Sequence, residues 1–276
     1  MKVIDFDRLF DEKLTQYMKE SKKKHTAKEW ENLIPKLYKK FGDTYIAKLK
    51  CTPKEYYGKM TDEELIQTLR THLEEDISTP DFLLTEIEKR NAVELLLPLL
   101  SGSEKEVEYG LRFIGDNPLA YDCYFQILEE NRANEEIRSE ITDLFRQNAD
   151  KVKTQAYALY QTGKAKEYAL EILSKIILRE EYIYETLLKE FQESDEKTLP
   201  RIVGYLASYG DERALPHLLR KIGDKSIGFL EFHELKYAID ALGGEYDEER
   251  DFTADKDYWA VETAKEKAAE ETQNKA

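Results

Sequence analysis

The chain has 276 residues, of which 41% are hydrophobic and 36% charged, and its formal net charge at pH 7 is −15. Its apolar residues recur periodically, which excludes general disorder, and no apolar run approaches the roughly 18 residues of a membrane span. The two cysteines, Cys51 and Cys123, exclude a disulfide framework and indicate a reduced compartment. We therefore expect a cytoplasmic protein that does not contact a membrane. Strand-like alternation is nearly absent, so we predict an all-α fold.

The charge is unevenly distributed along the chain. Residues 1–60 contain 15 Lys and Arg against 9 Asp and Glu, a net charge of +6, which leaves −21 for residues 61–276. Binding of bare nucleic acid needs a basic surface that displaces condensed counterions, so the acidic body argues against such a partner. Charge and apolar pattern together predict a basic N-terminal helical region (1–60), an acidic helical-repeat array (61–245) and an acidic, partly disordered tail (246–276).

Two apolar stripes with helical spacing dominate the N-terminal region. The first runs from Phe6 to Met18 and the second from Trp30 to Phe41, and the polar run 21–26 predicts a connection between them. These stripes favour packing of the region as a cap on the acidic array, because the end units of an array need a solvated closing face. Contact with an anionic partner is the alternative interpretation of its basic charge.

From residue 61 onward, the pattern predicts a succession of short helices. Thr61 and Glu64 form a capping-box pattern at the start of one of them. Residues 104–114 are expected to form the second helix of a later pair. In the block that ends near residue 210, we expect three helices, near 165–179, 181–193 and 196–209.

A short sequence motif occurs four times along the chain, and each copy ends an apolar-periodic stretch with a glycine. The copies end at Gly115, Gly163, Gly210 and Gly243, which are 48, 47 and 33 residues apart. Self-similarity at this scale predicts an array of helical units. A glycine after the last turn can take the left-handed conformation that closes a helix. An aspartate at the next position, as at Asp211, can cap the helix that follows.

The stretch 205–224 has the layout of a known repeat. One helix ends in a Gly-Asp pair, and the next begins with an arginine, a small residue and a Leu-Pro-x-Leu-Leu run, at Arg213, Ala214, Leu215, Pro216, Leu218 and Leu219. This layout resembles a HEAT-type repeat, and the stretch 97–116 fits a second copy. The copy that ends at Gly163 lacks the aspartate, and blocks of 47 residues are closer to three-helix armadillo units. The resemblance covers about residues 80–245 and implies an α-solenoid of HEAT/armadillo-like helical repeats with an N-terminal helical cap.

Residue types that carry catalysis or metal binding are scattered along the sequence. None of the four histidines forms a His-x-x-x-His pair or lies beside a cysteine pair, so familiar zinc spacings are absent. Cys51 has no nucleophile motif around it, and no glycine-rich phosphate loop exists. We predict no catalytic residue, no metal site and no cofactor, and the sequence leans toward a protein that is not an enzyme.

Tyrosine is unusually frequent, with 18 residues, and its side chain is enriched in binding hot spots. Arg201 and Tyr205 lie off the expected core stripe of their helix, as Tyr237 does on the last repeat helix. In HEAT-like arrays the second helices line the concave surface, so the resemblance implies five candidate ligand contacts: Arg112, Tyr160, Arg201, Tyr205 and Tyr237. Alternatively, these tyrosines cover the seams between repeats with their hydroxyls in water.

These observations favour a non-catalytic scaffold or adaptor that binds a protein or peptide on the concave face of the repeat array. The charge of −21 over residues 61–276 favours a basic partner. Two alternatives belong to other classes. One is a DNA-binding enzyme resembling the HEAT-like alkylpurine DNA glycosylases, against which the acidic repeats argue. The other is a pigment binder resembling the HEAT-type phycobilin lyases, for which no residue specifies a bilin pocket.

Overall fold

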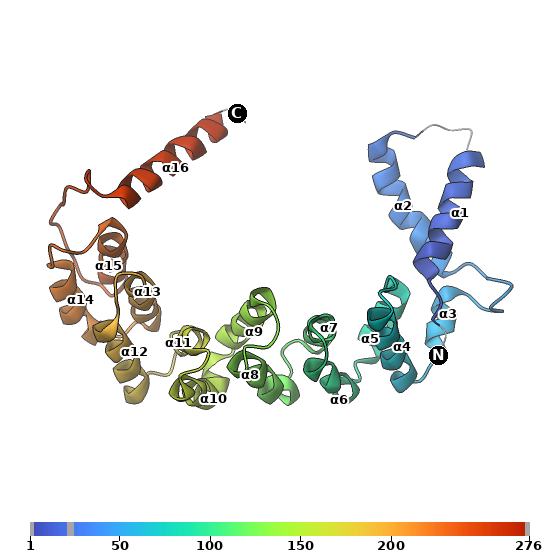
Figure 1. Ribbon diagram of the computed structural model, residues 1–276, viewed down its shortest axis with the longest axis horizontal. Coiled ribbons are helices and arrows are strands. Elements are labelled where there is room, and N and C mark those ends of the chain that lie inside the picture. Colours follow the sequence, from blue (N-terminus) through green and yellow to red (C-terminus); the bar gives the residue numbers. More distant parts are fainter. Residues whose placement is uncertain (1–2, 21–24, 274–276) are drawn as a thin grey trace. The chain divides into compact units, whose positions relative to one another are not determined.

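The computed structural model describes residues 3–20 and 25–273, which form helices joined by turns and loops (Figure 1). Within these residues there is no strand, only an isolated antiparallel bridge between Ile46 and Cys51. The predicted all-α fold is therefore confirmed. No helix in the described ranges is long and apolar enough to cross a membrane. Residues 21–24, which belong to the predicted connection at 21–26, lie outside the described part.

Contacts divide the chain into two units, which are described separately. Unit 1 comprises residues 1–127 and 132–137, and unit 2 comprises residues 128–131 and 138–276. The three regions predicted from charge and pattern are a division of another kind and stay a prediction.

Unit 1 consists of short helices, several of which begin at a capped residue. Its helices are α1 (Phe6–Glu20), α2 (Ala27–Gly42), α3 (Pro53–Gly58), α4 (Asp62–Glu74), α5 (Asp81–Arg90), α6 (Val93–Leu96), the 3-10 helix η1 (Leu97–Ser101), α7 (Glu104–Ile114), the 3-10 helix η2 (Pro118–Ala120) and most of α8 (Tyr121–Glu129). The capping box predicted at the start of α4 is confirmed. The Thr61 hydroxyl accepts the Glu64 backbone N–H at 3.2 Å, and the Glu64 carboxylate accepts the Thr61 backbone N–H at 2.8 Å.

The middle of unit 1 is well packed, whereas its N-terminal helix pair is covered only at one end. Helices α3 and α4 pack against α5, and α4 also contacts α6 and α7. In contrast, α1 buries only Phe6 and Phe10, and α2 buries only Phe41 and Gly42. The remaining residues of both predicted stripes are half-buried or exposed, so these stripes are helical as predicted but are not a full core.

In unit 2, helices that follow one another along the chain pack in pairs. Its helices are most of α9 (Glu135–Gln147), α10 (Ala149–Thr162), α11 (Lys166–Leu173), α12 (Glu181–Glu193), α13 (Leu199–Tyr209), the 3-10 helix η3 (Glu212–Ala214), α14 (Leu215–Ile222), α15 (Phe229–Ala241) and α16 (Lys256–Gln273). Helix α13 joins the pairs, because it contacts α11, α12 and α15. The apolar stripes expected on α13 and α15 are buried. They are Ile202, Val203, Leu206 and Tyr209 on α13, and Leu235, Ala238 and Ile239 on α15 with Leu242 directly after its end.

The glycines of the recurring motif lie at helix ends, and Gly163 and Gly210 take the predicted left-handed conformation, whereas Gly115 combines a positive φ with an extended ψ of −138°. Their φ angles are all positive: 55° at Gly115, 72° at Gly163, 74° at Gly210 and 80° at Gly243. Glycine accepts this conformation without the steric cost that a Cβ atom brings. The aspartate cap is also present, since the Asp211 carboxylate accepts the backbone N–H of Arg213 at 3.1 Å at the start of η3.

Two helix boundaries differ from the predicted ones. Helix α11 ends at Leu173 rather than near residue 179, because the chain turns directly after it. Helix α13 starts at Leu199 rather than at 196, because a side-chain turn described below occupies the preceding residues. In the predicted tail, α16 covers residues 256–273.

Candidate functional site

The loop between α12 and α13 forms the centre of the candidate site. The Asp195 carboxylate accepts the backbone N–H groups of Lys197 (3.1 Å) and Thr198 (2.9 Å) and the Thr198 hydroxyl (2.7 Å). An aspartate bonded to the backbone two and three residues ahead closes a turn. The Thr198 hydroxyl, followed by these backbone donors, holds the pKa of Asp195 below its usual range. This turn sets the direction in which α13 begins at Leu199.

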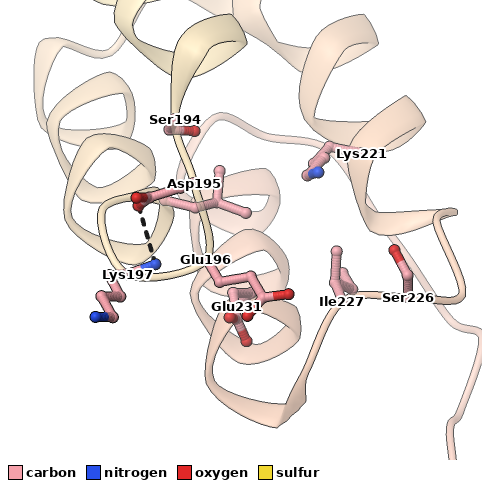
Figure 2. Close-up of a pocket in the computed structure, with 9 residues that line it drawn as sticks. Ser194, Asp195, Glu196, Lys197, Lys221, Ser226, Ile227 and Glu231 are labelled. Carbon is pink, nitrogen blue, oxygen red and sulfur yellow. Dashed lines mark hydrogen bonds between the residues drawn. The ribbon is translucent and has the colours of Figure 1, made fainter.

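Two hollows in unit 2 share this loop. The α11–α13 hollow has a volume of about 320 Å³, and the α13–α15 hollow, drawn in Figure 2, has about 460 Å³. The α11–α13 hollow is lined by Lys166, Glu167, Leu170, Glu190, Glu193, Ser194, Asp195, Thr198, Arg201 and Ile202. The α13–α15 hollow is lined by Ser194, Asp195, Glu196, Lys197, Leu199, Lys221, Ser226, Ile227 and Glu231. Both linings are dominated by charged and polar side chains, unlike the mainly apolar sites that hold small ligands.

Most cations in the two linings already have a carboxylate partner. The pairs are Lys166 with Glu190 at 2.7 Å, Arg201 with Glu167 at 2.6 Å and Lys221 with Asp224 at 3.8 Å. The Arg201 pair is bidentate, because two guanidinium nitrogens each donate to one oxygen of the Glu167 carboxylate. Two parallel hydrogen bonds between a planar guanidinium and a carboxylate are strong and geometrically specific. These cations are therefore poorly placed to recruit an anionic ligand.

Three carboxylates in the linings have no partner within the described part of the chain. Glu193, at the end of α12, lines the α11–α13 hollow, whereas Glu196 and Glu231 line the α13–α15 hollow. In Figure 2, Glu196 from the loop and Glu231 from α15 project into the same region. Lys197 is also without a side-chain partner among these residues, but its side chain points away from that region. The charge left uncompensated inside the hollows is thus negative.

The predicted contact Tyr160 belongs to the packing beneath the α11–α13 hollow. Its hydroxyl donates to the buried Glu190 carboxylate at 2.6 Å, and Lys166 lies over its ring at 5.7 Å. Burial, followed by this hydrogen bond to a carboxylate, raises the pKa of Tyr160. The hydroxyl is therefore engaged within the protein, while the charge of Glu190 is shared between two donors.

Two more predicted contacts, Arg201 and Tyr205, lie one turn apart on α13. Arg201 lines the α11–α13 hollow, but it is held by Glu167. Tyr205 is half-buried and is not among the lining residues. Burial, with a smaller effect of the nearby Glu171 carboxylate, raises the pKa of Tyr205 to about 12. Its hydroxyl is consequently protonated at neutral pH.

The last two predicted contacts are not brought together with the others. Arg112 lies in α7 of unit 1, where it pairs with Glu88 at 2.9 Å. Tyr237 lies on α15 with 68% of its surface exposed, and it lines neither hollow. Of the five predicted residues, Arg201 lines a hollow and Tyr160 contacts two residues of the same lining, Glu190 and Lys166. The binding roles of all five stay predictions.

The described residues contain no arrangement that points to a metal site. Within them, no group of three or more His, Cys, Asp and Glu side chains could hold a metal ion. Cys51 is buried, Cys123 is half-buried, and both are free thiols. What the hollows can do is attract and hydrogen-bond cationic groups through Glu193, Glu196 and Glu231.

The sequence offered only a weak signal for these three glutamates. The negative net charge of residues 61–276 was visible, but it did not single out any residue. Glu196 and Glu231 are brought to one hollow by the contact of α13 with α15, which no local pattern encodes. No protein-family model, curated protein or solved structure matches this chain.

Proposed function

We propose that this protein is a non-catalytic scaffold built of HEAT- or armadillo-like helical repeats, and that unit 2 binds a basic peptide segment of a partner protein. The proposal is carried by the unpaired carboxylates Glu193, Glu196 and Glu231 in two hollows that share one loop. The recurring glycines with positive φ support the repeat architecture, because each of the four lies at the end of a helix, as a repeated helical motif would require.

An extended peptide that crosses the α12–α13 loop would place basic side chains in both hollows. Lysine and arginine suit this site because their aliphatic stems can lie on apolar surface while their charged ends reach a carboxylate. Leu170 and Ile202 supply apolar surface in the α11–α13 hollow, and Leu199 and Ile227 supply it in the α13–α15 hollow. Complementary charge would speed the encounter as well as select the partner.

Neutralising the three glutamates together tests this proposal. The probe is a fluorescein-labelled peptide of about 10 residues that alternates lysine with glycine, a length that spans roughly 30 Å when extended. Fluorescence anisotropy of the full-length chain should give a Kd that rises about 10-fold in Glu193→Gln/Glu196→Gln/Glu231→Gln, because three exposed charge pairs are lost.

A matched variant separates the site from the overall charge. Glu185→Gln/Glu212→Gln/Glu234→Gln removes three exposed carboxylates of unit 2 that line neither hollow and have no ion-pair partner among the described residues. It changes the net charge equally, and we expect its Kd to stay within about 2-fold of the parent. An equal loss of binding in both variants would show that the peptide senses only the net charge, and the proposed site would be abandoned.

Further experiments on the same chain test two of the residues predicted from the sequence, Tyr205 and Tyr237, and the two alternative functions. Tyr205→Ala/Tyr237→Ala weakens binding if the ligand extends to the face that these tyrosines share in the repeat prediction. Labelled duplex DNA and free bilin serve as alternative probes. Saturable DNA binding that falls steeply with salt, or a visible absorption band with bilin, would favour the corresponding alternative.

A further inference from the structure

A groove runs between α1 and α2 at the N-terminal end of unit 1. It has a volume of about 210 Å³ and is lined by Phe10, Lys13, Leu14, Tyr17, Leu37, Lys40, Phe41 and Thr44. The two helices are held together beneath it by ring contacts of Phe10 with Tyr38 and Phe41, at 5.0 and 5.6 Å. The groove is smaller than the roughly 300–1,000 Å³ of sites for small ligands. Its size therefore suits one or two side chains of a peptide.

The apolar residues of the groove continue a stripe that the chain leaves partly uncovered. Leu14 and Leu37 are half-buried, and Tyr17 is 44% exposed, although all three lie on the faces that α1 and α2 turn toward each other. Farther along, Tyr17 and Trp30 still contact each other across the pair, with ring centroids 6.4 Å apart. A helix pair with an apolar groove of this kind can accept a third amphipathic helix.

The charges of the groove select the kind of helix. Lys13 and Lys40 are the charged side chains that line it, and no carboxylate does, although the chain as a whole has a net charge of −15. Neither lysine forms an ion pair with another residue in the described ranges. The Lys13 ammonium lies over the Phe41 ring, 5.0 Å from its centroid, so the two lysines border apolar surface and still lack a counter-charge.

We infer that this groove is a docking site for an acidic amphipathic helix of a partner protein. The apolar side chains of that helix enter between Leu14 and Leu37, and its flanking carboxylates pair with Lys13 and Lys40. A helix meets these requirements better than a membrane does, because the apolar groups are recessed in a groove, whereas membrane-bound helices present a protruding apolar face. With a basic-peptide site in unit 2, this second site would make the chain an adaptor between two partners of opposite charge.

The test uses the full-length chain with Trp259→Phe, which leaves Trp30 as its single tryptophan. Trp30 contacts the groove residue Tyr17, so its emission reports occupancy. The probe is a peptide of about 15 residues, long enough to form a helix, with leucine at helical spacing and glutamate and alanine elsewhere. We expect saturable binding that a scrambled peptide of the same composition does not reproduce, because scrambling removes the apolar face.

Charge reversal provides the decisive comparison. In Lys13→Glu/Lys40→Glu we expect the acidic peptide to bind at least about 10-fold more weakly, and the analogous lysine peptide to bind more tightly than it does to the parent. The control Lys36→Glu/Lys39→Glu makes the same change in net charge at exposed α2 positions outside the groove, and binding should change by less than about 3-fold. Circular dichroism checks that all variants keep their helix content.

Several outcomes would overturn the inference. If both charge variants bound the acidic peptide equally weakly, or if the scrambled peptide bound as tightly as the designed one, binding would reflect general charge attraction and would not depend on the groove. Binding to anionic vesicles but not to the peptide would assign the groove to a membrane, and a dimer in light scattering that Lys13→Glu/Lys40→Glu disrupts would assign it to a second copy. The lysine-glycine peptide and the glutamate variants of unit 2 test the other site, so either proposal can fail while the other stands.

Discussion

At the scale of single residues, His72 in α4 shows what burial does to a titratable group. It is completely buried, and neither ring nitrogen makes a hydrogen bond within the described part of the chain. Burial lowers the pKa of His72. The neutral imidazole is therefore the form that the folded state accommodates.

Stability of unit 1 should consequently fall in acid. Well above about pH 6.5, the His72 side chain is neutral in both the folded and the unfolded state. Below it, the unfolded state binds the proton first, so the free energy of unfolding decreases by at most about 1.4 kcal/mol per pH unit until the folded-state pKa is reached. Urea unfolding at about pH 7.5 and about pH 5.5, followed by Trp30 emission in Trp259→Phe, measures this change. His72→Leu should remove the dependence on this group, and an unchanged pH dependence in that variant would refute the assignment.

At the scale of the secondary-structure element, two glycines of α13 allow opposite predictions for one substitution. Gly210 ends the helix with φ of 74°. Gly204 lies inside it, and beyond its chain neighbours and the nearby backbone of its own helix, no atom lies within 4 Å of an added Cβ. Gly210→Ala should destabilise unit 2 by about 1–2 kcal/mol, because an L-residue pays for the left-handed conformation. Gly204→Ala should stabilise it by about 0.4–1 kcal/mol, because alanine restricts the unfolded chain and favours the helix.

Both changes can be measured in one background. Urea unfolding of Trp30→Phe, in which Trp259 is the remaining tryptophan, reports on unit 2. If Gly210→Ala were neutral, the positive φ would not be needed to close α13. The inference that such glycines mark the ends of repeats would then lose its physical basis.

At the scale of the whole molecule, the net charge of −15 opposes compaction. Exposed ion pairs such as Arg112 with Glu88 add little to the stability of the folded state. Raising NaCl from about 0.02 to about 0.3 M shortens the screening length and should raise Tm by about 2–4 °C. Near pH 4.9, where the ionisable groups of the sequence sum to a net charge of about zero, the same salt should have little effect because the net repulsion is removed. A Tm that fell with salt at neutral pH would mean that specific ion pairs outweigh the repulsion.

Much of the local structure could be predicted from the sequence because it depends on neighbours a few residues away. The helices, the capping box at Thr61, the left-handed closure at Gly210 and the buried stripe of α13 all follow from helical periodicity and from backbone hydrogen bonds near helix ends. The uneven distribution of charge was also available from the sequence, because it follows from counting the acidic and basic residues.

The candidate sites were decided by tertiary structure alone. Whether a charged side chain forms an ion pair depends on residues far away in sequence. Arg201 is paired with Glu167, whereas Glu196 and Glu231 line one hollow and neither forms an ion pair with a described residue. The groove of α1 and α2 includes Leu14, part of a stripe that predicted a core, and it stays open because no other helix of the described residues lines it. Local patterns record which face of a helix is apolar or charged, but only packing decides what that face meets.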